Sequence, residues 1–295
     1  MPLLPPTARE ATALRAEIVR SARRAESGLR SCAFRATPDP ETLHGLHRDL
    51  RELRVTHRLL VPLPRGAEGA DPTDRRLRGL AGLVGEVRDR DVAIELLLRS
   101  RGAGERKLLQ GLQTRLRHEG QVGRELLRAL ARTELDRHLL RTVIRDVSGA
   151  GAPSPARLRR EMETTLARYH ATVLRTFRRA LRKPSTRRLH RLRIALRNAR
   201  ALRTLFGRVT GHPANSVPAE LEKLQKTLGR LHDLDMVTDR IASLPAGAAL
   251  EQWEQRWRKA RKDERILVLA WMQRKRTRRS LTWLAPAASS RSARR

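Results

Sequence analysis

The chain carries the same two sequence motifs in each half, and this duplication constrains its fold more than any other feature. A basic motif beginning at His44 aligns without a gap over eleven residues with one beginning at His190, 146 residues later. An Arg-Asp-x-Asp motif at Arg88 aligns with a His-Asp-x-Asp motif at His232, 144 residues later. Because two motifs recur in the same order at nearly the same spacing, we predict that one structural unit is duplicated.

Both halves contain signals for helices. Capping residues stand directly before proline at Asp39, Asp71 and Ser154, as is usual in the first turn of a helix. Apolar residues then recur at helical spacing, and we find no alternation typical of strands. The sequence therefore predicts an all-α protein of two tandem helical bundles, each with about four long helices.

The domain boundaries follow from the Gly- and Pro-rich segments. Residues 148–155 are predicted to be a linker between a first repeat, 1–147, and a second repeat, 156–284. The last segment, 285–295, has few apolar residues and is predicted to be a disordered basic tail. Because duplicated helical units usually bury their apolar faces against each other, we expect the two repeats to form one domain.

The charge of the chain predicts a polyanionic partner. Its 64 Lys and Arg residues against 31 Asp and Glu give a net charge of +33, more than solubility requires. Most of the basic residues are Arg, whose planar guanidinium can bind two phosphate oxygens at once. Aromatic residues amount to only 3%, which argues against a single-stranded nucleic-acid groove. Nonspecific nucleic-acid binding in vitro is still expected from the charge alone.

A basic helix face is the main candidate binding surface. In the second copy this basic face consists of His190, Arg193, Arg197 and Arg200. On a helix these side chains follow one another about one turn apart, beside an apolar stripe, which suits a linear chain of phosphates. The surrounding stretch 164–219 contains 14 basic residues and no acidic residue, unlike an ordinary solvated helix face.

The predicted polyanion-binding residues are His44, His47, Arg51, Arg54 and Arg58 in the first half and His190, Arg193, Arg197, Arg200 and Arg203 in the second, with Arg168, Arg175 and Arg179 as secondary contacts. For the two aligned histidines, His44 and His190, two roles stay open. Each could make a structural hydrogen bond in the core or add a titratable charge to the basic face.

The acidic motif is expected to support the basic one. We expect these carboxylates near a helix end, where they can pair with and orient Arg side chains of the neighbouring helix rather than act directly. The residues concerned are Asp89, Asp91, Asp233 and Asp235.

An enzymatic alternative comes from the dipeptide His232-Asp233, which is found in metal-dependent HD-type phosphohydrolases. The position aligned with His232 is Arg88, which cannot bind a metal ion, so the duplication argues against this alternative. The sequence also has no Gly-rich phosphate loop and no nucleophile with an adjacent base. We therefore predict a non-catalytic protein without a metal or other cofactor.

These motifs resemble the CHAD (conserved histidine α-helical domain) family. The resemblance rests on His-x-x-Arg-hydrophobic-x-x-Arg at His190, its weaker copy at His44, and the acidic motifs after Gly85 and Gly229, and it covers nearly the whole chain. The family is duplicated, all-helical and associated with inorganic polyphosphate. The resemblance thus implies polyphosphate as the ligand, and two repeats related by pseudo-two-fold symmetry whose basic side chains face one shared groove or pore.

The location of the protein is predicted from the absence of targeting signals. The first residues lack a signal peptide, and the longest apolar stretch, 266–272, is too short to span a bilayer. We expect a cytoplasmic protein that can associate with polyphosphate granules, with no membrane partner and with an oligomeric state that the sequence leaves open.

Overall fold

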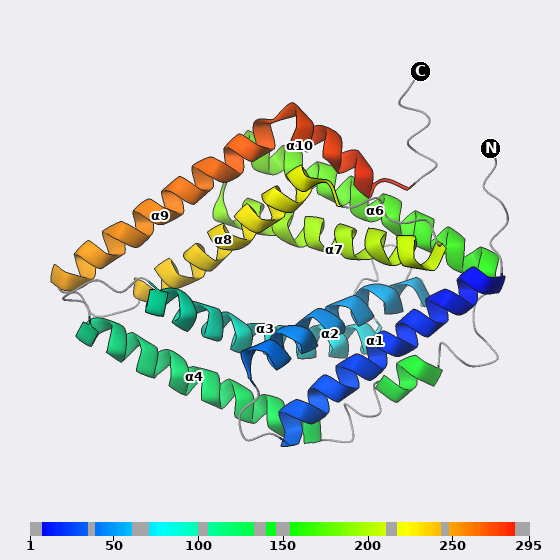
Figure 1. The fold of residues 1–295 in the computed structure, drawn as a ribbon, viewed down its shortest axis with the longest axis horizontal. Helices are drawn as coiled ribbons and strands as arrows, with labels where there is room; N and C mark the ends of the chain where they lie inside the picture. The colour runs from blue at the N-terminus through cyan, green and yellow to red at the C-terminus, as the bar shows by residue number, and fades with distance from the viewer. Residues whose placement is uncertain are drawn as a thin grey trace. The chain divides into compact units, whose positions relative to one another are not determined.

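Helices make up all the regular structure in the part of the chain that the structure describes (Figure 1). The structure is a computed structural model, and it describes residues 8–34, 39–60, 71–99, 106–132, 140–145, 154–210, 217–242 and 248–286. No strand occurs in these residues, which confirms the predicted all-α class.

In the described residues, each half of the sequence contributes four long helices. In the first half they are α1 (Ala8–Phe34), α2 (Pro40–Leu60), α3 (Pro72–Arg99) and α4 (Arg106–Arg132). In the second half they are α6 (Pro155–Arg182), α7 (Thr186–Thr210), α8 (Ala219–Ile241) and α9 (Ala248–Gln273). Residues 140–145 are also helical, and α10 (Lys275–Ser280) and the 3-10 helix η1 (Leu281–Leu284) follow α9.

The predicted helix starts are confirmed by their caps. The Asp39 Oδ1 atom accepts a hydrogen bond of 2.7 Å from the backbone N–H of Thr42. The Asp71 carboxylate accepts from the N–H groups of Thr73, at 3.1 Å, and Asp74, at 3.0 Å. These bonds satisfy amide groups that have no partner within the helix, which is why the helices begin at these prolines.

Three helices continue further than the sequence predicted. The acidic motif was expected near a helix end, but α3 runs on from Asp91 to Arg99 and α8 from Asp235 to Ile241. The apolar spacing explains the extension, because residues four apart after each motif are buried: Ala93 and Leu97 in α3, and Val237 and Ile241 in α8. The Gly- and Pro-rich segment 207–218 also predicts a break, but α7 runs on to Thr210, because Phe206 and Val209 on either side of Gly207 are buried.

The chain divides into two compact units built from non-contiguous segments. Unit 1 contains the described residues of Met1–Asp91, Leu116–Thr164 and Leu205–His212, and unit 2 contains those of Val92–Arg115, Thr165–Thr204 and Pro213–Arg295. The predicted repeat boundaries stay predictions. Most of the predicted linker 148–155 and of the predicted tail 285–295 lies outside the described residues.

In unit 1, α1 and α2 lie side by side (Figure 1). They bury Ile18 on α1 and Leu46 and Leu50 on α2. The helices approach closely at Gly28, where a Cβ atom would lie only 3.1 Å from the Leu46 Cδ1 atom. A larger residue at this position would press against the Leu46 side chain, which would have to shift.

In unit 2, one core fixes the orientation of α7. The apolar stripe predicted beside the basic face is buried, and it consists of Leu189, Leu192, Leu196 and Ala199. Its partners include Phe177 of α6, Leu228 of α8 and Met272 of α9, and α8 and α9 lie side by side (Figure 1). Because the apolar stripe is buried in this core, the adjoining basic face of α7 lies at the edge of the core.

Candidate functional site

The basic face of α7 combines access to solvent with contacts to its neighbours. All four residues of this face, His190, Arg193, Arg197 and Arg200, are partly exposed. The aligned α2 residues are arranged similarly: His44 is exposed, and His47, Arg51 and Arg54 are partly exposed. The side chain of Arg58 lies outside the described residues. Each face therefore keeps part of its positive charge accessible to an anion.

His190 meets a second histidine on α8. Its Nδ1 atom lies 3.2 Å from the Nδ1 atom of His232, and the two ring centroids are 4.6 Å apart. A hydrogen bond between two imidazole nitrogens requires that one ring donates and the other accepts. The contact therefore orients both rings and allows only one hydrogen atom between them.

His44 meets an arginine at the corresponding place in unit 1. The Arg88 Nε–H donates a hydrogen bond of 3.1 Å to the Nδ1 atom of His44. Burial and the positive charge of Arg88 lower the pKa of His44, followed by the charges of Arg48 and Arg51. His44 is thus a neutral ring at neutral pH that accepts through Nδ1.

These two contacts join the same aligned positions in the two halves. The sequence alignment places His44 over His190 and Arg88 over His232, and each pair meets within its own unit. Arg88 and His232 were absent from the predicted site residues, although their alignment as two basic residues before Asp was visible. What the sequence did not contain is the rotation of α3 and α8 that turns them toward the basic faces.

His47 lies against α3 at Gly85. A Cβ atom at this glycine would be 3.4 Å from the Cε1 and Nε2 atoms of the His47 ring. Gly85 is buried, so the absence of a side chain lets the ring rest directly on the helix. His47 is thereby fixed one turn from His44, on the same face of α2.

The second aspartate of each acidic motif binds an arginine of the next long helix. Asp91 on α3 forms an ion pair with Arg124 on α4, and Asp235 on α8 forms one with Arg261 on α9. Burial raises the pKa of Asp235, and the charge of Arg261 partly opposes this effect. The aspartates therefore bind arginines of α4 and α9, whereas the basic faces lie on α2 and α7, so their expected role in supporting those faces stays a prediction.

The first aspartate of each acidic motif is less buried than the second. The Asp89 Oδ1 atom lies 3.5 Å from the Nη1 atom of Arg88, the partner of His44. Asp233, which follows His232, is partly exposed on α8. Both carboxylates therefore stand next to the residue that meets the histidine of the basic face.

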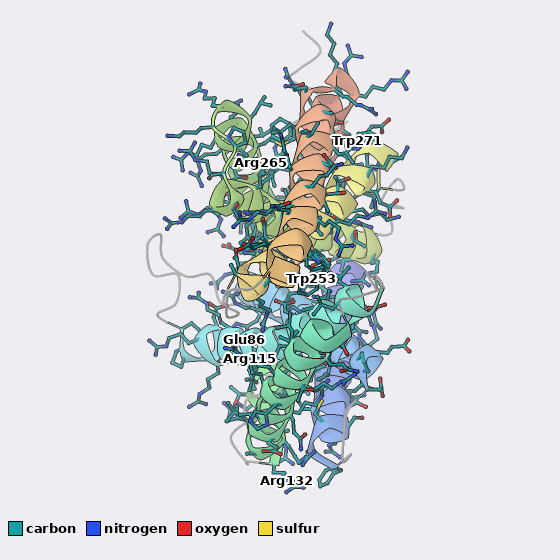
Figure 2. All side chains as sticks on the ribbon, turned by 90° about the vertical axis from the view of Figure 1, so that its left-hand side faces the viewer. Glu86, Arg115, Arg132, Trp253, Arg265 and Trp271 are labelled. Carbon is teal, nitrogen blue, oxygen red and sulfur yellow. The ribbon has the colours of Figure 1, made fainter. Side chains whose placement is uncertain are left out.

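Two arginines of α9 fasten this helix to the start of α7. Besides binding Asp235, Arg261 donates a hydrogen bond of 2.9 Å to the Thr186 Oγ1 atom. Arg265 of α9, whose label stands at a height between those of Trp253 and Trp271 in Figure 2, donates to the backbone carbonyl of Pro184. These bonds fix the first turn of α7, one turn before His190.

Arg54 and Arg200 are tied to neighbouring helices. The Arg54 Nε–H donates a hydrogen bond of 2.8 Å to Asp74, whose side chain is completely buried. The Arg200 Nη1 atom donates one of 3.1 Å to Gln225, and its Nη2 atom lies 3.8 Å from Glu222. Both guanidinium groups are oriented by the protein before any ligand binds.

Arg203 belongs to the packing of the C-terminal helices. Its Nε–H donates a hydrogen bond of 3.2 Å to the Trp283 carbonyl, and its Cζ atom lies 5.7 Å from the centroid of the Trp283 ring. Burial lowers the pKa of this arginine. The aligned residue, His57, is buried with its Nδ1 atom 3.5 Å from Asp71. This position is therefore engaged with protein groups in both halves.

The secondary candidates on α6 are exposed. Arg168, Arg175 and Arg179 are all solvent-accessible. The Nη2 atoms of Arg168 and Arg175 donate to Thr165 at 2.9 Å and to Thr172 at 3.3 Å, both within α6. Arg168 and Arg175 thus each contact a threonine one turn earlier in the same helix.

Neither a metal cluster nor a membrane span is found in the described part of the chain. Among these residues, no three His, Cys, Asp or Glu side chains gather in a way that could hold a metal ion. No helix there is long and apolar enough to cross a bilayer.

Comparisons with known proteins agree with the fold. The model of the CHAD domain family matches residues 13–242 and 181–294. The crystal structure of the CHAD domain from the plant Ricinus communis is similar with a TM-score of 0.63 and 19% identity, covering 95% of this chain and 93% of that one. PptA from Streptomyces chartreusis is similar with a TM-score of 0.64 and 16% identity, covering 90% of this chain and 99% of that one.

No curated protein matches the sequence. The match to the family model nevertheless extends over almost the entire chain, and the fold is shared with a solved CHAD domain. The chain is a member of the CHAD domain family.

Proposed function

We propose that the protein binds inorganic polyphosphate, without catalysing its turnover, through the basic faces of α2 and α7. The observation that carries this proposal is the repeated basic contact, His44 with Arg88 and His190 with His232, at the head of each arginine series. Membership of the CHAD family and the net charge of +33 support polyphosphate as the ligand.

The physical basis is a row of partly preorganised cations. Side chains one helical turn apart can contact successive phosphates of an extended chain. Arg54 and Arg200 are oriented by neighbouring helices, so less conformational entropy is lost when a phosphate binds near them. The polymer also releases condensed counterions when arginines neutralise it, as any dense polyphosphate backbone does.

The binding surface can be tested with Arg193→Ala and Arg197→Ala together. We expect polyphosphate affinity to fall at least about tenfold, because charge-assisted hydrogen bonds are lost. The far-ultraviolet circular dichroism should stay unchanged, since both side chains reach solvent. A matched control is Arg75→Ala with Arg76→Ala, which removes two exposed charges at the start of α3. Equal losses in both double variants would contradict the proposed surface.

A competition experiment tests whether the protein prefers polyphosphate to nucleic acid. Duplex DNA and polyphosphate of equal phosphate content should be titrated against each other over a range of salt concentrations. The proposal requires that DNA displaces polyphosphate poorly, whereas displacement in proportion to charge would indicate nonspecific binding. Incubation of the protein with polyphosphate should release no phosphate. Shortening of the polyphosphate that requires the protein would contradict a non-catalytic role.

We also propose a cytoplasmic location, with association with polyphosphate granules where these exist. A fluorescent fusion should overlap with stained granules, and the variant with Arg193→Ala and Arg197→Ala should become diffuse. If this variant still binds to granules, its localisation does not depend on the basic face of α7.

A further inference from the structure

We propose that the two basic faces differ in proton linkage: the face in unit 2 takes up a proton at His190 and His232 when an anion binds, whereas Arg88 gives unit 1 a permanent charge. This inference rests on the proposed function, because the ligand is taken to be polyphosphate. It adds His232 and Arg88 to the residues that determine affinity.

The geometry of the histidine pair limits its charge. Two neutral rings share one hydrogen atom between the Nδ1 atoms of His190 and His232, which are 3.2 Å apart. An added proton can be held at the Nε2 atom of the donor ring, which leaves the hydrogen bond intact and gives the pair a charge of +1. A second added proton would set two N–H groups against each other and break the contact. The pair thus titrates between neutral and +1 while it stays together.

The corresponding pair in unit 1 cannot titrate in this way. The guanidinium of Arg88 stays charged at all physiological pH values. It donates to the Nδ1 atom of His44, so that ring remains neutral while the contact exists. The charge of this pair is therefore fixed at +1, and the aligned places in the two halves carry a constant and a variable charge.

Charged groups on α7 and α8 set the proton affinity of the pair. On α7, Arg187 and Arg193 stand one turn before and one turn after His190 and disfavour a further positive charge. On α8, the partly exposed Asp233 directly follows His232 and favours one. A bound phosphate chain adds negative charge beside the arginines and shifts this balance toward the protonated pair.

Groups on the other helices contribute less. On α9, Arg261 forms an ion pair with Asp235, and Arg265 binds the carbonyl of Pro184, so their charges are already directed elsewhere. On α6, Val173, Phe177 and the partly buried Tyr169 pack in the core behind α7, and burial lowers the pKa of the neighbouring His170. The bound anion is therefore the group whose arrival changes the field at the histidine pair most.

The sign of the pH dependence follows from this arrangement. An anion raises the pKa of the histidine pair, so binding takes up protons and affinity rises as pH falls through the histidine range. The effect is complete below the pKa of the free pair and disappears above the pKa of the bound pair. One linked proton changes affinity by at most about tenfold per pH unit.

The test compares polyphosphate affinities from about pH 8 to about pH 6 for the full chain and for His232→Arg. We expect the wild-type affinity to rise by about tenfold over this range, whereas His232→Arg should bind tightly at both ends with a flatter profile. The reciprocal variant, Arg88→His, should have a steeper profile than the wild type. His118→Gln, which removes an exposed histidine of α4, should leave the profile unchanged.

Proton uptake can also be measured without any variant. Calorimetric titration of the wild type with polyphosphate near pH 7, in two buffers that differ in ionisation enthalpy, gives the number of protons bound with the ligand. A number clearly above zero supports the inference. Parallel pH profiles for wild type and His232→Arg, or no proton uptake in the wild type, would overturn it. Absence of wild-type binding at every pH would instead refute the proposed function.

Discussion

Arg54 on α2 donates a hydrogen bond of 2.8 Å to Asp74 on α3, whose side chain has no exposure to solvent. Arg78 also approaches this carboxylate, at 3.2 Å. A residue of the basic face therefore provides a counter-charge that allows an ionised group to be buried. The same arginine serves the fold and the positive potential of the surface.

Asp74→Ala should strongly destabilise the protein. The substitution leaves Arg54 half-buried without its main acceptor, and breaking a buried ion pair costs about 3 kcal/mol of the free energy of unfolding. Urea denaturation followed by circular dichroism measures this change. Asp239→Ala, at an exposed position on α8, should change stability by less than about 0.5 kcal/mol. Similar effects of the two substitutions would show that the Arg54–Asp74 contact contributes little.

Glu17 is predicted to make part of the stability dependent on pH. Burial raises its pKa, but the hydrogen bond from Arg20 and the charges of Arg208, Arg20 and Arg24 outweigh this, so the pKa is lowered from 4.5. A lowered pKa means that this stabilisation is complete above the unfolded-state value and is lost as pH falls through the folded-state value. Melting temperatures of wild type and Glu17→Gln should therefore differ at pH 7 and converge in acid. A constant difference at all pH values would contradict this assignment.

Two glycines of α4 should respond in opposite ways to alanine. A Cβ atom at Gly123 would lie 2.8 Å from Val87 Cγ2, so Gly123→Ala should overpack the contact with α3 and cost about 1–3 kcal/mol. Gly111 has no neighbouring atom within 4 Å of the same position. Gly111→Ala should therefore stabilise the helix by up to about 1 kcal/mol, because alanine has the higher helix propensity. Chemical denaturation of both variants gives the comparison.

Arg203→Ala should reduce stability more than it reduces polyphosphate affinity. Its guanidinium is bound to the Trp283 carbonyl and lies over the Trp283 ring, so it is engaged in packing. We expect a lower melting temperature and an affinity within about threefold of the wild type. A large loss of polyphosphate affinity with an unchanged melting temperature would instead show that Arg203 belongs to the binding surface.

The sequence predicted the elements that depend on local rules. Asp39 and Asp71 before proline placed two helix starts correctly, because capping acts within one turn. Helical periodicity also separated the buried stripe at Leu192 and Leu196 from the basic face beside it.

Features that depend on contacts between helices could not be predicted as well from the sequence. The acidic motif was expected near a helix end because a carboxylate there meets a neighbouring helix easily, but Asp91 and Asp235 reach α4 and α9 from within their helices. The different settings of Arg200, on Gln225, and Arg203, on Trp283, depend on which element packs beside α7. No spacing rule contains that information.

The unequal partners of the two aligned histidines, Arg88 for His44 and His232 for His190, have a genetic consequence. Codons for arginine and histidine can differ by a single base, so one nucleotide substitution converts either pairing into the other. A single substitution can thus replace a constant charge by a titratable one while the helix that carries it stays the same. Evolution could in this way adjust the acid sensitivity of each copy independently.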